Sequence, residues 1–196
     1  MTADNGDYPA RPEVQTGEYV QLHSRAFQAL VGVLALGCGP GIAQDQTGGE
    51  TVSVETKPAL VVYDKELGPG WQNWSWAKTA LSVELSGSSR KPIKVEAGPW
   101  QAMYLHHDAF TTTGYRQLGM LIQGSTPAAE ARVFALIDGK VNGEGRLVRF
   151  GNTGWTKVVI PLAALGVEDK PIDGIWIQNG SPVDLPKFYV TEIQLE

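Results

Sequence analysis

Short apolar runs, separated by turn-forming residues, are the feature that most constrains the fold of this 196-residue chain. From residue 58 onward, each run ends near glycine, proline, asparagine or aspartate, which favour turns. Helical periodicity is nearly absent, apart from one short turn at 163–166. We predict strands at 59–63, 74–83, 92–96, 101–107, 117–123, 131–137, 146–150, 155–160, 172–178 and 187–195. This pattern is typical of an all-β protein, a two-sheet antiparallel β-sandwich.

The N-terminal region 1–43 has the organisation of an extension followed by an export leader. Arg25 precedes a charge-free apolar run at 26–37. A run of about a dozen residues is shorter than the roughly 20 needed to span a bilayer, but it suits a secretory signal. The run ends at Cys38 in a sequence that resembles a bacterial lipobox, so Cys38 is the candidate lipidation site and a lipid anchor is expected. Cleavage after Ala43 is the alternative, and a buried helix is a third interpretation.

Two further boundaries follow from composition. Residues 44–57 are polar and rich in glycine and threonine, so we predict a flexible linker. Residues 58–196 then form the β-sandwich domain. We expect an exported protein, either secreted or held at the cell surface as a lipoprotein. The net charge is −5 and no basic cluster is present, which argues against nucleic acid as a partner and against a polybasic membrane patch.

Three of the six tryptophans lie in the W-Q-N-W-S-W segment at 71–76. In a strand, alternation places Trp74 and Trp76 on one face, with Asn73 and Ser75 on the other. An indole is large, flat and mostly apolar, with one N–H donor. Two such rings on one face would line a sugar-binding groove or fill a sandwich core, and the spacing is compatible with both.

Two later strands have the same division into an apolar and a polar face. In 101–107 and 172–178, methionine, leucine and isoleucine alternate with aromatic and polar residues. The apolar set is predicted to face the core, so the other set faces outward. The outward residues that could bind a ligand are Tyr104 and His106 on the first strand and Trp176 and Gln178 on the second. An incidental polar surface, or a loop covering Trp176, are the alternatives.

Sequence signals for catalysis are weak. The domain has no Gly-x-Ser-x-Gly elbow, phosphate-binding loop or cysteine. Carboxylates are present, but their spacing singles out no pair for glycoside hydrolysis. His106 and His107 are adjacent and would point to opposite sides of a strand, and the domain has no further histidine or cysteine to complete a zinc site. We therefore predict a non-enzymatic protein.

Five segments resemble the β-jelly-roll carbohydrate-binding modules, galactose-binding-like sandwiches of the kind attached to secreted bacterial glycoside hydrolases. The segments are V-Y-D at 62–64, W-Q-N-W-S-W at 71–76, Y-L-H-H at 104–107, W-T-K-V-V-I-P-L at 155–162 and F-Y-V at 188–190. The resemblance implies a jelly roll whose concave face binds glycan. Carried over residue by residue, that face consists of Trp74, Trp76, Tyr104, His106, Trp176 and Gln178.

A structural calcium ion is the one cofactor that the resemblance suggests. Such modules often have an aspartate directly after the F-Y-V stretch, and here Thr191 occupies that position, followed by Glu192. Calcium needs several oxygen ligands, and Asp64 and Glu66 near the first strand would join Glu192 near the last.

The sequence as a whole predicts an exported, non-catalytic protein that binds a polysaccharide or oligosaccharide through aromatic and amide side chains on one sheet face. The alternative is a structural or adhesive cell-surface protein that uses the same sandwich to contact protein partners. In that case, the face around Trp176 would be an interface rather than a glycan groove.

Overall fold

A computed structural model describes residues 57–196 of this chain. The predicted leader, including Cys38 and Ala43, and nearly all of the predicted linker lie outside the described residues. Among residues 57–196, no helix is long and apolar enough to cross a membrane.

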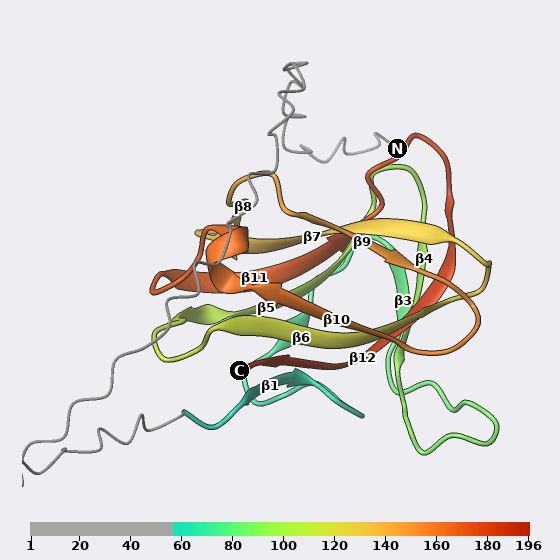
Figure 1. The fold of residues 1–196 in the computed structure, drawn as a ribbon, viewed down its shortest axis with the longest axis horizontal. Coiled ribbons are helices and arrows are strands. Elements are labelled where there is room, and N and C mark those ends of the chain that lie inside the picture. The colour runs from blue at the N-terminus through green and yellow to red at the C-terminus, as the bar shows by residue number, and fades with distance from the viewer. Residues whose placement is uncertain (1–56) are drawn as a thin grey trace, which may run out of the picture. The chain divides into compact units, whose positions relative to one another are not determined.

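The described residues form two six-stranded antiparallel sheets (Figure 1). Sheet A contains, in order, β10 (Thr156–Pro161), β6 (Gln117–Gly124), β12 (Leu185–Leu195), β4 (Ile93–Ala97) and β3 (Lys78–Ala80), and β1 (Leu60–Tyr63) also pairs with β12. Sheet B contains, in order, β2 (Gln72–Asn73), β5 (Ala102–Thr111), β11 (Pro171–Gln178), β7 (Ala129–Ile137) and β8 (Lys140–Val141), and β9 (Arg146–Phe150) also pairs with β7. The predicted all-β sandwich is confirmed.

The core lies between the two sheets and consists of alternate side chains from each strand. On β6, Leu118, Met120 and Ile122 are at most 2% exposed. They belong to one cluster with Ile175 and Ile177 of β11. Burial of every second residue is the expected result when one face of each sheet packs against the other sheet.

The alternation predicted for β5 and β11 is observed. Met103 and Leu105 are fully buried in the core cluster, as are the isoleucines of β11. Tyr104 pairs with Trp176 in the register between the two strands. Because paired residues share a face, these two rings lie together on the face of sheet B that points away from the core.

One predicted strand, 74–83, is correct only at residues 78–80. Strand β2 ends at Asn73 in sheet B, and β3 begins at Lys78 in sheet A. The chain therefore crosses from one sheet to the other over residues 74–77, with Ala77 buried in the core. The sequence pattern correctly indicated strand-forming residues in this region, but it did not reveal that the chain passes from one sheet to the other.

Turn chemistry sets the short hairpin that joins β7 to β8. Asp138 and Gly139 both have positive φ, 51° and 69°, between the paired residues Ile137 and Lys140. Two positive φ angles are what a two-residue hairpin turn requires, and aspartate followed by glycine favours them. The predicted turn at this position is confirmed, although the two-residue strand β8 was not predicted. The predicted helical turn is a 3₁₀ segment at Leu162–Leu165.

Candidate binding face

Four aromatic side chains form a row across the outward face of sheet B. The register places Tyr104 of β5 opposite Trp176 of β11, and Trp176 opposite Phe134 of β7. At the edge, the backbone N–H of Trp74 donates to the carbonyl oxygen of Tyr104 at 2.9 Å. Segments far apart in the sequence thus bring their rings together, and we call Trp74, Tyr104, Trp176 and Phe134 the aromatic row.

The rings of the aromatic row contact one another edge to face. Ring centroids are 5.9 Å apart for Trp74 and Tyr104, 5.7 Å for Tyr104 and Trp176, and 6.4 Å for Phe134 and Trp176. Such packing is favourable beyond the area it buries. Tyr104 and Phe134 are each 8% exposed, whereas Trp74 is 53% exposed. The row therefore has a buried floor and an open indole at one end.

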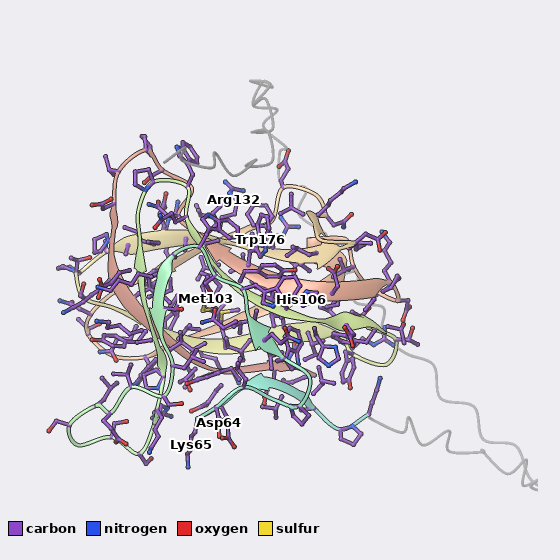
Figure 2. The ribbon with its side chains drawn as sticks, turned by 180° about the vertical axis from the view of Figure 1, so that it is seen from behind. Asp64, Lys65, Met103, His106, Arg132 and Trp176 are labelled. Carbon is purple, nitrogen blue, oxygen red and sulfur yellow. The ribbon has the colours of Figure 1, made fainter. Side chains whose placement is uncertain are left out.

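A second set of side chains lies beside the aromatic row, two residues further along each strand. Gln178 of β11 pairs with Ala102 of β5 and with Arg132 of β7. Trp76 is 43% exposed, and its ring lies 4.7 Å from that of Trp176 at an angle of 81°. Among the residues that Figure 2 labels, His106 of β5, Trp176 of β11 and Arg132 of β7 belong to this face.

Ser75 explains how Trp74 and Trp76 both come to lie on this face outside a regular strand. The backbone N–H of Tyr104 donates to Ser75 Oγ at 2.9 Å. Ser75 Oγ and its backbone N–H donate to Asn73 Oδ1 at 2.5 and 3.2 Å. The hydroxyl thus replaces the backbone acceptor that a longer β2 would supply, and the chain continues along the edge of β5.

His106 supports the exposed indole of Trp74. The two rings are stacked, with centroids 3.7 Å apart and planes inclined by 21°. His106 Nδ1 shares a 2.9 Å hydrogen bond with the Tyr104 hydroxyl, and Trp74 Nε1 donates to Gln72 Oε1 at 2.9 Å. Burial, and secondarily the charge of Asp173, raise the pKa of the Tyr104 hydroxyl. The phenol therefore keeps its proton at neutral pH. The contacts with His106 and Gln72 hold the Trp74 ring in one orientation.

Glycine at position 174 makes room for the Tyr104 ring. A Cβ at Gly174 would lie 2.4 Å from Tyr104 Cε2 and 3.0 Å from the carbonyl oxygen of Leu105. Gly174 is the register partner of His106. The ring of Tyr104 therefore packs directly against the backbone of Gly174. In this position its hydroxyl is within hydrogen-bond distance of His106.

Trp100 extends the face beyond the residues predicted from the sequence. It is 52% exposed and has a φ of +61°. It stands third in a four-residue turn closed by a bond from Gln101 N to Gly98 O of 3.1 Å, where positive φ normally calls for glycine. Its carbonyl oxygen accepts from Trp76 Nε1 at 3.3 Å and from Gln178 Nε2 at 3.0 Å. One N–H of the Gln178 amide is thus engaged, and its Oε1 has no hydrogen-bond partner among the described residues.

Two buried polar atoms on β11 lack a hydrogen-bond partner among the described residues. They are Asp173 Oδ1 and Trp176 Nε1. The other carboxylate oxygen of Asp173 accepts from the backbone N–H of Gly139 at 2.6 Å. An unsatisfied buried polar group costs about 1–3 kcal/mol.

The structure brings all six sequence-predicted residues onto the outward face of sheet B, and we call this surface the binding face: Trp74, Trp76, Tyr104, His106, Trp176 and Gln178, with Trp100, Arg132 and Phe134. Exposure of Trp74 and Trp76 excludes the alternative in which both fill the core. Trp176 is covered by neighbouring rings, one of which, Trp76, lies in the connection between β2 and β3, so the alternative of a covering loop is correct in part. Their role in ligand binding stays a prediction. Sequence reasoning missed three residues of the face, Trp100, Arg132 and Phe134.

The position suggested for calcium does not suit a metal ion. Thr191 Oγ1 is buried and donates to the carbonyl oxygen of Asp64 at 2.7 Å. Glu192 forms an ion pair with Arg90 at 2.7 Å. Within residues 57–196, no group of three or more histidine, cysteine, aspartate or glutamate residues is placed to hold a metal. The predicted ligands Asp64, Glu66 and Glu192 are therefore not gathered around one site.

Comparison with known proteins shows a similarity of fold to one group of solved structures. No protein-family model and no curated protein matches the chain. Among solved structures, a family 29 carbohydrate-binding module superposes with a TM-score of 0.51 at 13% identity, covering 70% of this chain and 86% of the module. The sandwich is similar to that of family 29 carbohydrate-binding modules.

Two further structures of this kind also match. A family 29 module from Piromyces equi has 19% identity and a TM-score of 0.49, covering 70% of this chain and 88% of the module. A lysine-to-alanine mutant of another family 29 module, complexed with cellulohexaose, has 12% identity and a TM-score of 0.48, covering 70% and 89%. At these identities the likeness concerns the fold.

Proposed function

We propose that this protein is a non-catalytic carbohydrate-binding protein whose ligand lies on the outward face of sheet B. The observation that carries the proposal is the exposure of three indoles, Trp74, Trp76 and Trp100, between 43% and 53%, beside a buried aromatic floor. Flat apolar rings with polar groups nearby match the surface of a sugar ring, which has apolar C–H faces and hydroxyl edges.

The polar groups of the face support an oligosaccharide or polysaccharide ligand. The rings of Trp74 and His106 are held by hydrogen bonds to Gln72 and Tyr104. Gln178 Oε1 remains as an acceptor next to Trp76. Because these groups are already oriented, little side-chain entropy is lost on binding. Affinity is nevertheless expected to be modest, since ligand hydroxyls exchange water for protein partners at small net gain.

Affinity electrophoresis of the full chain tests this proposal. Gels would contain soluble β-glucan, xylan, mannan or pectin, and the wild type would be compared with Trp74→Ala. Trp155→Ala is the matched control, because Trp155 precedes β10 of sheet A and lies over Arg90, outside the binding face. Retardation by one polymer that Trp74→Ala loses and Trp155→Ala keeps supports the proposal. A wild type that no polymer retards overturns it.

A second candidate function rests on the same exposed indoles. Exposed apolar patches also mark protein–protein interfaces, so the alternative is a structural or adhesive cell-surface protein. Analytical ultracentrifugation of the full chain separates the two functions. A stable oligomer that Trp76→Ala dissociates would favour the interface, whereas a monomer would favour the glycan face.

We also propose that the protein is exported, as a secreted protein or a cell-surface lipoprotein attached through Cys38. What supports export is the charge-free apolar run at 26–37 after Arg25. Attachment to a glycoside hydrolase, as the sequence resemblance suggests, belongs to the same proposal. Mass spectrometry of the mature N-terminus would distinguish acylation at Cys38 from cleavage after Ala43.

A further inference from the structure

Arg132 places a positive charge on the binding face. It is the register partner of Gln178, so their Cβ atoms lie about 5 Å apart on the same side of the sheet. Gln178 in turn donates to the carbonyl oxygen of Trp100. Arg132 therefore lies in the set that contains Trp76, Trp100 and Gln178, directly beside the aromatic row (Figure 2).

No described carboxylate pairs with Arg132. Residues 57–196 contain five arginines. Three of them form ion pairs with glutamates, and the two that do not are Arg132 and Arg146. Glu130, which precedes Arg132 by two residues on β7, pairs instead with Arg149. Arg146 of β9 is the register partner of the core residue Val133, so it lies on the other face of sheet B and Arg132 is the unpaired arginine of the outward face.

The guanidinium of Arg132 is held in place but keeps free donors. Nη1 donates to the backbone carbonyl oxygen of Glu144 at 2.8 Å. This bond uses part of the planar fork and leaves other N–H groups without a partner among the described residues. A fork of this kind binds a carboxylate through two parallel hydrogen bonds, whereas a neutral hydroxyl uses one of them.

From this placement we propose that the ligand is an acidic polysaccharide that contains uronic acid. Its carboxylate binds the Arg132 guanidinium while a neighbouring sugar ring lies against the indole of Trp76. This inference rests on the proposed carbohydrate-binding function and names the chemical class of the ligand. Asp173, the carboxylate on the neighbouring strand β11, is 9% exposed and accepts from the backbone N–H of Gly139 rather than from Arg132.

The test measures binding of the full chain to sodium polygalacturonate and alginate, to neutral glucomannan and β-glucan, and to sulfated carrageenan, at low and high sodium chloride. The expected result is preference for a uronan over every neutral polymer, weakened by salt. Arg132→Gln should weaken uronan binding about tenfold, as expected for loss of one charge-assisted bidentate contact. Neutral polymers should bind Arg132→Gln as they bind the wild type.

Two variants control for charge and geometry. The double variant Glu130→Gln with Arg149→Gln removes an ion pair from the same face without leaving a carboxylate unpaired beside Arg132, so uronan binding should stay within about twofold of the wild type. Arg132→Lys keeps the charge without the fork and should recover only part of the affinity.

The outcomes separate this inference from the proposed function. Tighter binding of a neutral polymer, or an equal loss by Arg132→Gln for neutral and acidic polymers, overturns the uronate assignment and leaves carbohydrate binding intact. Preference for carrageenan over both uronans assigns the anion as a sulfate ester and also overturns it. Failure to bind any polymer overturns both proposals.

Discussion

Substitution of Gly174 tests the geometry of the binding face, because a single methyl group at this position would displace the ring of Tyr104. The Cβ of Gly174→Ala would lie 2.4 Å from Tyr104 Cε2, about 1 Å short of the 3.4 Å at which ordinary contact begins. The ring would have to rise from the sheet by about that amount. Its 2.9 Å hydrogen bond to His106 would then lengthen beyond useful range, and the stack of His106 on Trp74 would loosen.

The expected cost follows from the same contacts. Forcing extra volume into a packed site costs about 1–3 kcal/mol of unfolding free energy. For a domain of this size, each kcal/mol lowers Tm by about 3–5 °C. Gly174→Ala should therefore melt about 3–15 °C below the wild type. Its affinity for the ligand should also fall, since the exposed indole of Trp74 loses the support that fixes its orientation.

Thermal unfolding followed by far-UV circular dichroism gives the stability, and near-UV circular dichroism reports the packing of the aromatic row. Gly180→Ala is the matched control. Gly180 follows β11 by two residues, and an added Cβ there would meet nothing within 4 Å. If Gly174→Ala melts within 1 °C of Gly180→Ala and has the same near-UV spectrum, the Tyr104 ring does not lie over Gly174 and the reasoning is refuted.

Three further predictions concern the surroundings of the face and the opposite sheet. Ser75→Ala leaves the Tyr104 N–H without its acceptor, so we expect about 1 kcal/mol less stability by urea unfolding and weaker ligand binding, and unchanged binding would contradict the role given to Ser75. Hydrogen bonds from Lys94 and then Lys78 lower the Glu96 pKa to about 2. The stability that this lowered pKa contributes is present at neutral pH and is lost on acidification from about 4.5 towards 2. The Tm of Glu96→Gln should therefore fall less than the wild-type Tm over that range. Thr191→Val should lower the free energy of unfolding by about 1–3 kcal/mol, because it leaves the carbonyl oxygen of Asp64 unpaired. EDTA should leave the wild-type Tm unchanged. A large effect of EDTA would show that the fold depends on a metal ion.

The sequence predicted well wherever local periodicity decides the structure. On β5 and β11 the alternation of apolar and polar residues predicts which side chains enter the core cluster, because a strand has two faces and only one meets the other sheet. The turn at Asp138-Gly139 was also predictable, since both residues tolerate the positive φ that the turn imposes. These are properties of a few neighbouring residues.

Features set by distant residues could not be predicted in the same way. The end of β2 depends on Ser75, whose partner Tyr104 is 29 residues away. Arg132 resembles any polar residue of an alternating strand until the register places it opposite Gln178. For Trp100 a local signal did exist: Gly98 and Pro99 predict a turn, and a residue at a turn tip is exposed.

At position 100, the residue that would best stabilise the fold differs from the residue that the proposed ligand binding would favour. A left-handed backbone costs a residue with a side chain about 1–2 kcal/mol, which glycine does not pay, so Trp100→Gly should raise the free energy of unfolding. The same substitution would remove a half-exposed indole from the edge of the binding face. A library of variants sorted for heat resistance alone should therefore enrich glycine at position 100. The same library sorted for retention on an immobilised ligand should keep tryptophan. The difference in unfolding free energy between the two selected proteins would measure the stability lost by keeping tryptophan for binding.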